Sequence, residues 1–162
     1  MYRGEHIDSR DRADFYTQLT EQLCALMEPD LGDVANLANA AALIYLQMPD
    51  LNWAGFYLVR DEELILGPFQ GKPACTRIAL GAGVCGVAAE ERATQVVPDV
   101  HAFPGHIACD PESRSELVVP LVKDGQLLGV LDLDSPRPAR FDAMDGEHME
   151  AFAAALAEYL EA

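Results

Sequence analysis

The segment DVHAFPGHIACD, residues 99–110, gathers several side chains that can do chemistry. It holds His101, His106, Cys109 and Asp110 within a polar stretch. A thiolate is a strong nucleophile, and a cysteine beside two histidines has a route to a lowered thiol pKa. We therefore predict that Cys109 is a nucleophile, with a passive loop cysteine as the alternative.

The same residues leave a metal site open as a second interpretation. His101, His106 and Cys109 could hold zinc, with Cys75 or Cys85 as the fourth ligand. However, their spacing matches no zinc module, and the chain has no C-x-x-C pair. We therefore expect neither a metal nor a cofactor.

A group of carboxylates forms the second chemical feature. The run 130–134, VLDLD, alternates with period two, so Asp132 and Asp134 share one face of a predicted strand. Glu116 begins the neighbouring predicted strand and is expected to lie close to them. Clustered carboxylates raise one another's pKa, so one can stay protonated near neutral pH. This favours a pocket that binds an ammonium group or donates a proton, and a water-facing sheet is the alternative.

Two aromatic residues and two further cysteines could complete such a pocket. Trp53 and Tyr57 lie four residues apart in a predicted strand and share a face, which suits either a pocket wall or the core. Cys75 lies in the predicted third strand. Cys85 lies at a predicted helix start, where the helix dipole would favour a thiolate. Either cysteine could resolve a sulfenic acid formed at Cys109.

Hydrophobic spacing indicates how the chain positions these residues. Leu19 and Leu23 mark the apolar face of a first helix, in which we expect Cys24 to be buried. A hairpin turning at Asp124-Gly125 is the clearest strand pattern. The element order predicts an α+β fold. Helices are expected over 11–28, 32–48, 81–92 and 141–162, strands over 52–59, 63–69, 74–80, 94–100 and 115–135, and a long loop over 98–114.

Length and charge limit the classes of protein that fit. A chain of 162 residues without repeats or a linker suits one domain. The net charge of −16 opposes binding to nucleic acid or to anionic membranes. The charged N-terminal segment is no secretory signal, so we expect a cytoplasmic protein whose cysteines are reduced.

Six motifs in order give a resemblance to a known family: NWAGFY, LGPFQGKPAC, GAGVCG, DVHAFPGHIACD, SELVVPLV and GVLDLDS. Over residues 14 to 160 the chain resembles the free methionine-(R)-sulfoxide reductases, which are GAF-domain enzymes. The resemblance implies an antiparallel six-stranded sheet with helices on one face and a ligand pocket on the other. It implies one GAF domain over 1–162, with residues 1–12 as an N-terminal extension.

The resemblance also implies roles for the candidate residues. Cys109 would be the catalytic cysteine, Cys75 its usual resolving partner and Cys85 an alternative partner. The implied activity is reduction of free L-methionine (R)-sulfoxide through a sulfenic acid and an intramolecular disulfide, which thioredoxin reduces again. A homodimer stays open, and a GAF sensor module without catalysis is the main alternative. The implied substrate-binding residues are Trp53, Tyr57, Glu116, Asp132 and Asp134.

Overall fold

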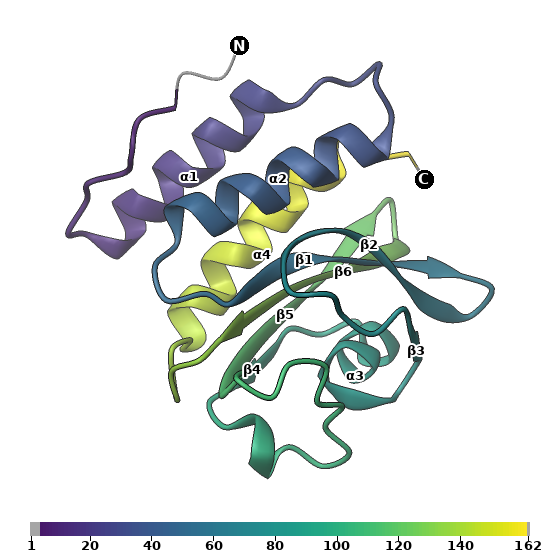
Figure 1. Ribbon diagram of the computed structural model, residues 1–162. Coiled ribbons are helices and arrows are strands. Elements are labelled where there is room, and N and C mark those ends of the chain that lie inside the picture. The colour runs from purple at the N-terminus through teal and green to yellow at the C-terminus, as the bar shows by residue number, and fades with distance from the viewer. Residues whose placement is uncertain (1–3, 162) are drawn as a thin grey trace.

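An antiparallel sheet of six strands forms the centre of the structure, a computed structural model that describes residues 4–161 (Figure 1). The strands lie in the order β3-β2-β1-β6-β5-β4, and every neighbouring pair is antiparallel. The α+β fold and the six-stranded sheet are therefore confirmed. The strands are β1 Trp53–Arg60, β2 Glu63–Gly71, β3 Arg77–Ala79, β4 Gln95–Val97, β5 Ser115–Lys123 and β6 Gln126–Ser135.

Three helices lie on one side of the sheet, as Figure 1 shows: two pack on its strands, and the first packs on those two helices. They are α1 Arg12–Leu26, α2 Asp33–Gln47 and α4 Ala143–Ala157. Helix α4 begins where Asp142 accepts hydrogen bonds from two backbone N–H groups and so caps the helix. The core between these helices and the sheet includes Leu19, Leu23, Leu37, Phe56, Leu117, Leu131, Leu133 and Phe152, all buried.

The fourth helix, α3 Gly83–Glu91, packs on the opposite face of the sheet (Figure 1). Its Val84 and Ala88 are buried in a second apolar cluster together with Trp53, Tyr57 and Val118. The expectation that helices cover one face therefore holds for three of the four helices. Helix α3 closes part of the other face and leaves the rest of it for a pocket.

Tight pairing of the last two strands fixes the register of the sheet. They are joined at Asp124 and Gly125, whose φ angles of 50° and 79° are both positive. This conformation matches the twist of the flanking strands and favours glycine and aspartate, so the predicted hairpin is confirmed. Because paired residues share a face, this register decides which side chains meet in the pocket.

Two sequence-based expectations about cysteines are wrong. Cys24 is exposed, because the buried face of α1 is formed by Tyr16, Leu19 and Leu23, and the next residue points about 100° away from Leu23. Cys75 does not lie in a strand, since β3 begins only at Arg77. It belongs to the connection that follows β2. The predicted loop over 98–114 holds one short 3-10 helix, η1 Val100–Ala102.

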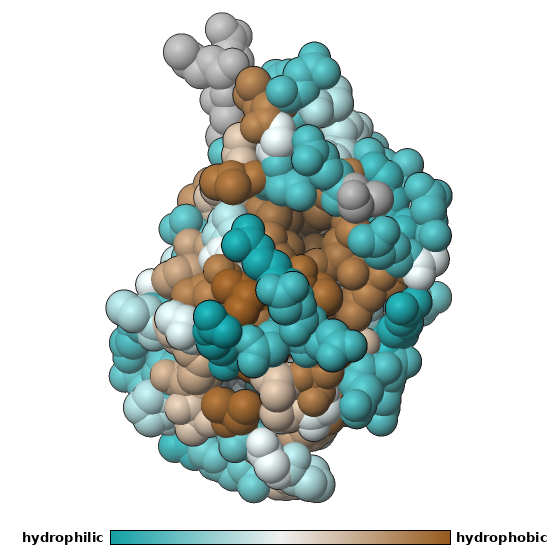
Figure 2. All heavy atoms as spheres, turned by 90° about the vertical axis from the view of Figure 1, so that its right-hand side faces the viewer, coloured by the Kyte–Doolittle hydropathy of each residue, from teal (hydrophilic) through white to brown (hydrophobic). Residues whose placement is uncertain are grey.

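Apolar side chains also reach the surface of the molecule. Leu31, Val34 and Leu46, within or next to α2, are 67%, 73% and 65% exposed. The face drawn in Figure 2 shows brown apolar areas bordered by teal hydrophilic residues. Between residues 4 and 161, no helix combines the length and the apolar character needed to cross a membrane.

Candidate active site

The three predicted carboxylates come together on the face of the sheet that α3 covers in part. Asp134 of β6 pairs with Trp53 of β1 on one side and with Glu116 of β5 on the other. Asp132 lies two residues earlier and therefore on the same face. Asp132 and Glu116 are only 5% and 6% exposed, so a water-facing sheet does not describe them.

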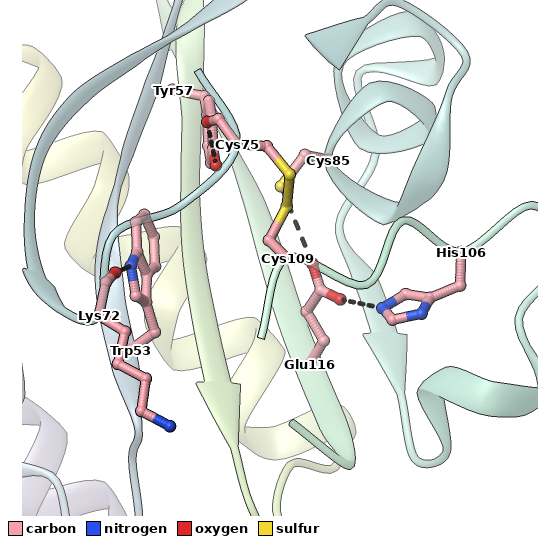
Figure 3. Close-up of a disulfide and its surroundings, with 8 residues drawn as sticks. All are labelled: Trp53, Tyr57, Lys72, Cys75, Cys85, His106, Cys109 and Glu116. Atoms are coloured by element: carbon pink, nitrogen blue, oxygen red, sulfur yellow. Dashed lines mark hydrogen bonds and ion pairs between the residues drawn. A yellow bond between two sulfur atoms is a disulfide. The ribbon is translucent and has the colours of Figure 1, made fainter. Parts of the chain in front are cut away.

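A disulfide joins Cys75 and Cys109 over these carboxylates. The Cα atoms of the two cysteines lie 5.7 Å apart, although 34 residues separate them in the chain. Figure 3 shows the disulfide together with Cys85, whose Sγ donates a hydrogen bond to Glu116 Oε1 over 3.8 Å. The structure thus joins the pair of cysteines that the resemblance implied, and it shows the chain in its oxidised state.

The polar ends of the two aromatic residues hold the segment that carries Cys75. The indole Nε1 of Trp53 donates to the backbone oxygen of Lys72 over 3.1 Å, and the hydroxyl of Tyr57 donates to that of Cys75 over 2.9 Å. The two rings stack at 5.9 Å and line the cavity together with the carboxylates. These residues therefore fix one disulfide partner and form a wall of the pocket (Figure 3).

An ion-pair clasp connects the two segments that carry the disulfide. Lys72 Nζ lies 2.6 Å from Glu112 Oε2 and 3.7 Å from Asp110 Oδ1. On the other side, the Asn52 amide donates to Asp110 and to Ser113. The pKa of Asp110 lies below its usual value. The largest cause is a hydrogen bond from the Glu112 backbone N–H, and smaller contributions come from Asn52 and Lys72.

The surroundings of the three carboxylates favour their protonated forms. Burial raises the pKa of Asp132 to about 6. Burial also raises the pKa of Glu116 and of Asp134 well above the usual range, and the charge of Asp132 raises both further. A buried carboxylate without a cation is costly, so it keeps its proton to a higher pH. The expected rise in pKa is therefore present at all three carboxyl groups, with burial as its largest cause. It is not mutual, because a hydrogen bond with Glu116 lowers the pKa of Asp132.

Cys85 does not have the environment of a reactive thiolate. Although it lies near the start of α3, burial raises the pKa of its thiol well above the usual range, and Asp132 and Glu116 raise it further. The expectation that the helix dipole favours a thiolate is therefore wrong. Two neighbouring carboxylates and full burial outweigh one turn of a short helix.

The two histidines of the 99–110 segment have different surroundings. His106 Nε2 lies 3.8 Å from Glu116 Oε2, and burial lowers the pKa of His106, which favours the neutral ring. His101 is exposed. The zinc set considered from the sequence is not assembled, because its Cys75 and Cys109 sulfurs are bonded to each other.

The pocket between these groups is small in the oxidised state. Its cavity measures about 40 Å³ and is lined by the carboxylates, the aromatic wall and the Cys109 segment. Since one water needs about 10–15 Å³, a few waters fit and an amino acid does not. The cavity has to widen before a larger ligand can enter.

Lys72, Asn52 and Ser113 were missed by reasoning from the sequence. Lys72 precedes Cys75 by three residues, while Asp110 and Glu112 follow Cys109 by one and three. This opposite charge beside the two cysteines was a usable pattern. The contacts of Asn52 and Ser113 depend on the tertiary fold and left no such pattern.

Comparison with known proteins first defines the class of the fold. The GAF domain family model matches residues 13–160, which covers all six strands and three complete helices besides most of α1. The antiparallel sheet with helices and a pocket on its second face is thus a GAF fold.

Several relatives share almost the full length of the chain. The free methionine-R-sulfoxide reductase of Escherichia coli is 47% identical over 93% of this chain and 91% of its own length. The one from Saccharomyces cerevisiae is 43% identical over 94% and 91%. The structure of the Neisseria meningitidis free methionine-R-sulfoxide reductase in complex with its substrate covers 98% of this chain and 95% of that chain, at 45% identity and a TM-score of 0.91. The chain belongs to the free methionine-R-sulfoxide reductase family.

Proposed function

We propose that this chain reduces free L-methionine (R)-sulfoxide to L-methionine, with Cys109 as the nucleophile. Its family consists of oxidoreductases that act on sulfur. The observation that carries the proposal is the Cys75–Cys109 disulfide, which lies over the buried carboxylates Glu116 and Asp132. Such a disulfide is the product expected when a thiol pair has reduced a substrate.

The first step transfers the sulfoxide oxygen to the enzyme. The thiolate of Cys109 attacks the sulfoxide sulfur, and a protonated carboxyl group of the cluster gives its proton to the oxygen. The oxygen passes to the sulfur of Cys109 as its bond to the methionine sulfur and the transient bond between the two sulfurs break. Methionine leaves, and Cys109 holds the oxygen as a sulfenic acid. The pKa values of Glu116 and Asp134, raised well above the usual range, support this role, because a proton donor must carry its proton at neutral pH. Asp132, with a pKa of about 6, is mostly ionised at pH 7.

The second step forms the disulfide that the structure contains. The Cys75 thiol attacks the sulfur of the sulfenic acid, and water leaves. Hydrogen bonds from Trp53 and Tyr57 hold the segment around Cys75 in reach of Cys109. Thioredoxin, acting in the cytoplasm, would then reduce the disulfide by thiol–disulfide exchange.

Charge gives the pocket a preference for a free amino acid. The remaining carboxylates of the cluster would bind the α-ammonium group of the substrate, and the stacked Trp53 and Tyr57 would contact its S-methyl end. In a peptide this ammonium is replaced by a neutral amide. A buried carboxylate without its partner costs on the order of a few kcal/mol, so discrimination should be large.

The test is NADPH consumption coupled through thioredoxin and thioredoxin reductase. We expect turnover with free methionine (R)-sulfoxide, and a kcat/KM at least about a hundredfold lower with the same sulfoxide inside a peptide. Comparable values for the two substrates would contradict the proposed role of the carboxylates. No consumption with either substrate would instead favour a GAF sensor that binds a ligand without catalysis.

A further inference from the structure

Cys85 remains a free, buried thiol in the lining of the pocket after Cys75 and Cys109 have formed their disulfide. Its sulfur, one oxygen of Glu116 and one of Asp132 all lie within 4.8 Å of one another, and all three residues are buried. They come from α3, β5 and β6, so the tertiary fold brings them together. The proposed reaction uses the carboxylates but gives Cys85 no necessary task.

This cluster lacks a positive partner in the oxidised state. Asp132 Oδ1 is buried and has no hydrogen-bond partner among residues 4–161, which is rare for such an atom. Lys72 lines the same cavity, but its ammonium group lies against Glu112 and Asp110. Buried acidic groups are stable when they keep a proton, pair with a cation or bind a metal ion.

The size and the chemistry of the cluster select the kind of cation. A cavity of about 40 Å³ has room for an ion with one water. One sulfur together with carboxylate oxygens suits a borderline-soft ion such as Zn²⁺, whereas Mg²⁺ and Ca²⁺ prefer oxygen alone. His106 Nε2, 3.8 Å from Glu116 Oε2, adds a nitrogen at the edge of the cluster.

We propose that Cys85, Glu116 and Asp132 form a binding site for a thiophilic divalent cation of the Zn²⁺ type. Positions 85, 116 and 132 are too far apart in the chain to form a sequence motif, so the expectation of no metal could not take them into account. One consequence rests on the proposed function: because Glu116 and Asp132 would also bind methionine sulfoxide, the metal and the substrate exclude each other.

The test uses Co²⁺ as a spectroscopic probe for Zn²⁺ on the oxidised protein. In this state Cys24 and Cys85 are the free thiols, and Cys24→Ala leaves Cys85 alone. We expect one Co²⁺ per chain, with a thiolate-to-metal absorption band in the near ultraviolet that Zn²⁺ abolishes. The band should vanish when Cys85→Ala is added. Asp132→Asn should weaken binding more than about tenfold, since even partners outside the ligand set affect affinity that much.

Glu63→Gln is the matched carboxylate control, because Glu63 lies on the surface against Arg77 and should leave Co²⁺ binding unchanged. Absence of the band at millimolar Co²⁺ would overturn the proposal, as would a band that persists in Cys85→Ala. A second measurement needs no pocket variant: Zn²⁺ should slow alkylation of Cys85 in the native sequence and spare the exposed Cys24. An unchanged rate at Cys85 would also overturn the proposal. These readouts need no turnover, so they are independent of whether the chain reduces methionine sulfoxide.

Discussion

Cys75 and Cys109 have separate tasks in the proposed reaction, and a substitution can separate them. With Cys75→Ser, the sulfenic acid at Cys109 loses its expected partner, so the reaction should stop after its first step. We expect one methionine per chain from the pre-reduced variant, without further turnover when thioredoxin is supplied. Quantifying released methionine against protein concentration measures this.

Cys85 provides the alternative outcome for that experiment. It lies beside the disulfide (Figure 3), although its raised thiol pKa makes it a poor attacking group at neutral pH. If Cys75→Ser keeps the full thioredoxin-dependent rate, Cys85 rather than Cys75 resolves the sulfenic acid.

The buried carboxylates also predict how stability depends on pH. The folded-state pKa of Asp132 is about 6 and lies above its unfolded value, so the folded state binds the extra proton. Its contribution is fully present below about pH 4, the pKa of the unfolded state, and is lost as pH rises through 6. The free energy of unfolding should therefore decrease less between pH 4 and 7 in Asp132→Asn than in the native chain. The expected difference is on the order of 1–3 kcal/mol.

Denaturant titrations of the oxidised protein and the variant at several pH values measure this difference. The lowered pKa of His106 acts in the opposite direction over part of this range, and it is common to both proteins. The account of the buried acids fails if the two curves of stability against pH run parallel.

At the scale of single residues, the sequence predicted most of the site. Period two in VLDLD placed Asp132 and Asp134 on one face, and the structure agrees because the hairpin at Asp124-Gly125 fixes the register. The direction of the Cys85 pKa could not be predicted, since it depends on carboxylates from β5 and β6. Cys24 was predicted to be buried but is exposed, because a shift of one position along α1 moves a side chain from the buried face to the surface.

At the scale of elements, the ion-pair clasp is expected to align the two cysteine segments. Lys72→Gln should slow disulfide formation about two- to fivefold in a single turnover, the modest effect of an exposed ion pair, and leave methionine release unchanged. Lys72→Arg should restore the rate. Thiol loss after mixing with substrate gives the rate. Arg77→Gln removes a comparable surface ion pair away from the cysteines and serves as the control. An equal slowing in Arg77→Gln would remove the special role of Lys72.

The segment 99–114 is expected to act as a lid over the pocket. It contributes His106, Ile107 and Cys109 to the lining of a cavity too small for an amino acid in the oxidised state. Reduction of the disulfide should release this segment, and substrate should order it again. Hydrogen exchange should be at least about tenfold faster there in the reduced, ligand-free protein than in the oxidised one. Equal and strong protection in the reduced, substrate-bound and oxidised states would show a rigid site.

The Cys75 segment is not held by strand pairing. Cys75 was predicted to lie in the third strand, but it lies in a connection before β3. Its segment is held instead by Trp53 and Tyr57, whose side chains donate to backbone oxygens of Lys72 and Cys75. Short strands such as β3 are hard to delimit from sequence, because tertiary hydrogen bonds decide where they begin. The long elements α1, α2, β5 and β6 were predicted closely.

At the scale of the whole molecule, the net charge and the exposed apolar side chains affect which molecules the protein binds more than they affect its fold. A net charge of −16 opposes binding to polyanions and is compatible with attraction of a substrate that bears an ammonium group. A homodimer stays a prediction. Apolar side chains that a second copy could cover are exposed at Leu31, Val34 and Leu46, and Figure 2 shows apolar areas on one face. Analytical ultracentrifugation of the native chain distinguishes a monomer from a dimer.

The central claim is that Cys109 itself removes oxygen from free methionine (R)-sulfoxide, with Cys75 completing the disulfide. The most direct measurement is a single turnover: fully reduced protein is mixed with free methionine sulfoxide of both epimers, without any reductant. We predict one methionine per chain, drawn from the (R) epimer alone, together with loss of the Cys75 and Cys109 thiols and formation of the disulfide seen in the structure. Cys109→Ser should release no methionine. Release of methionine by Cys109→Ser, or loss of thiols without methionine in the native chain, would contradict the account.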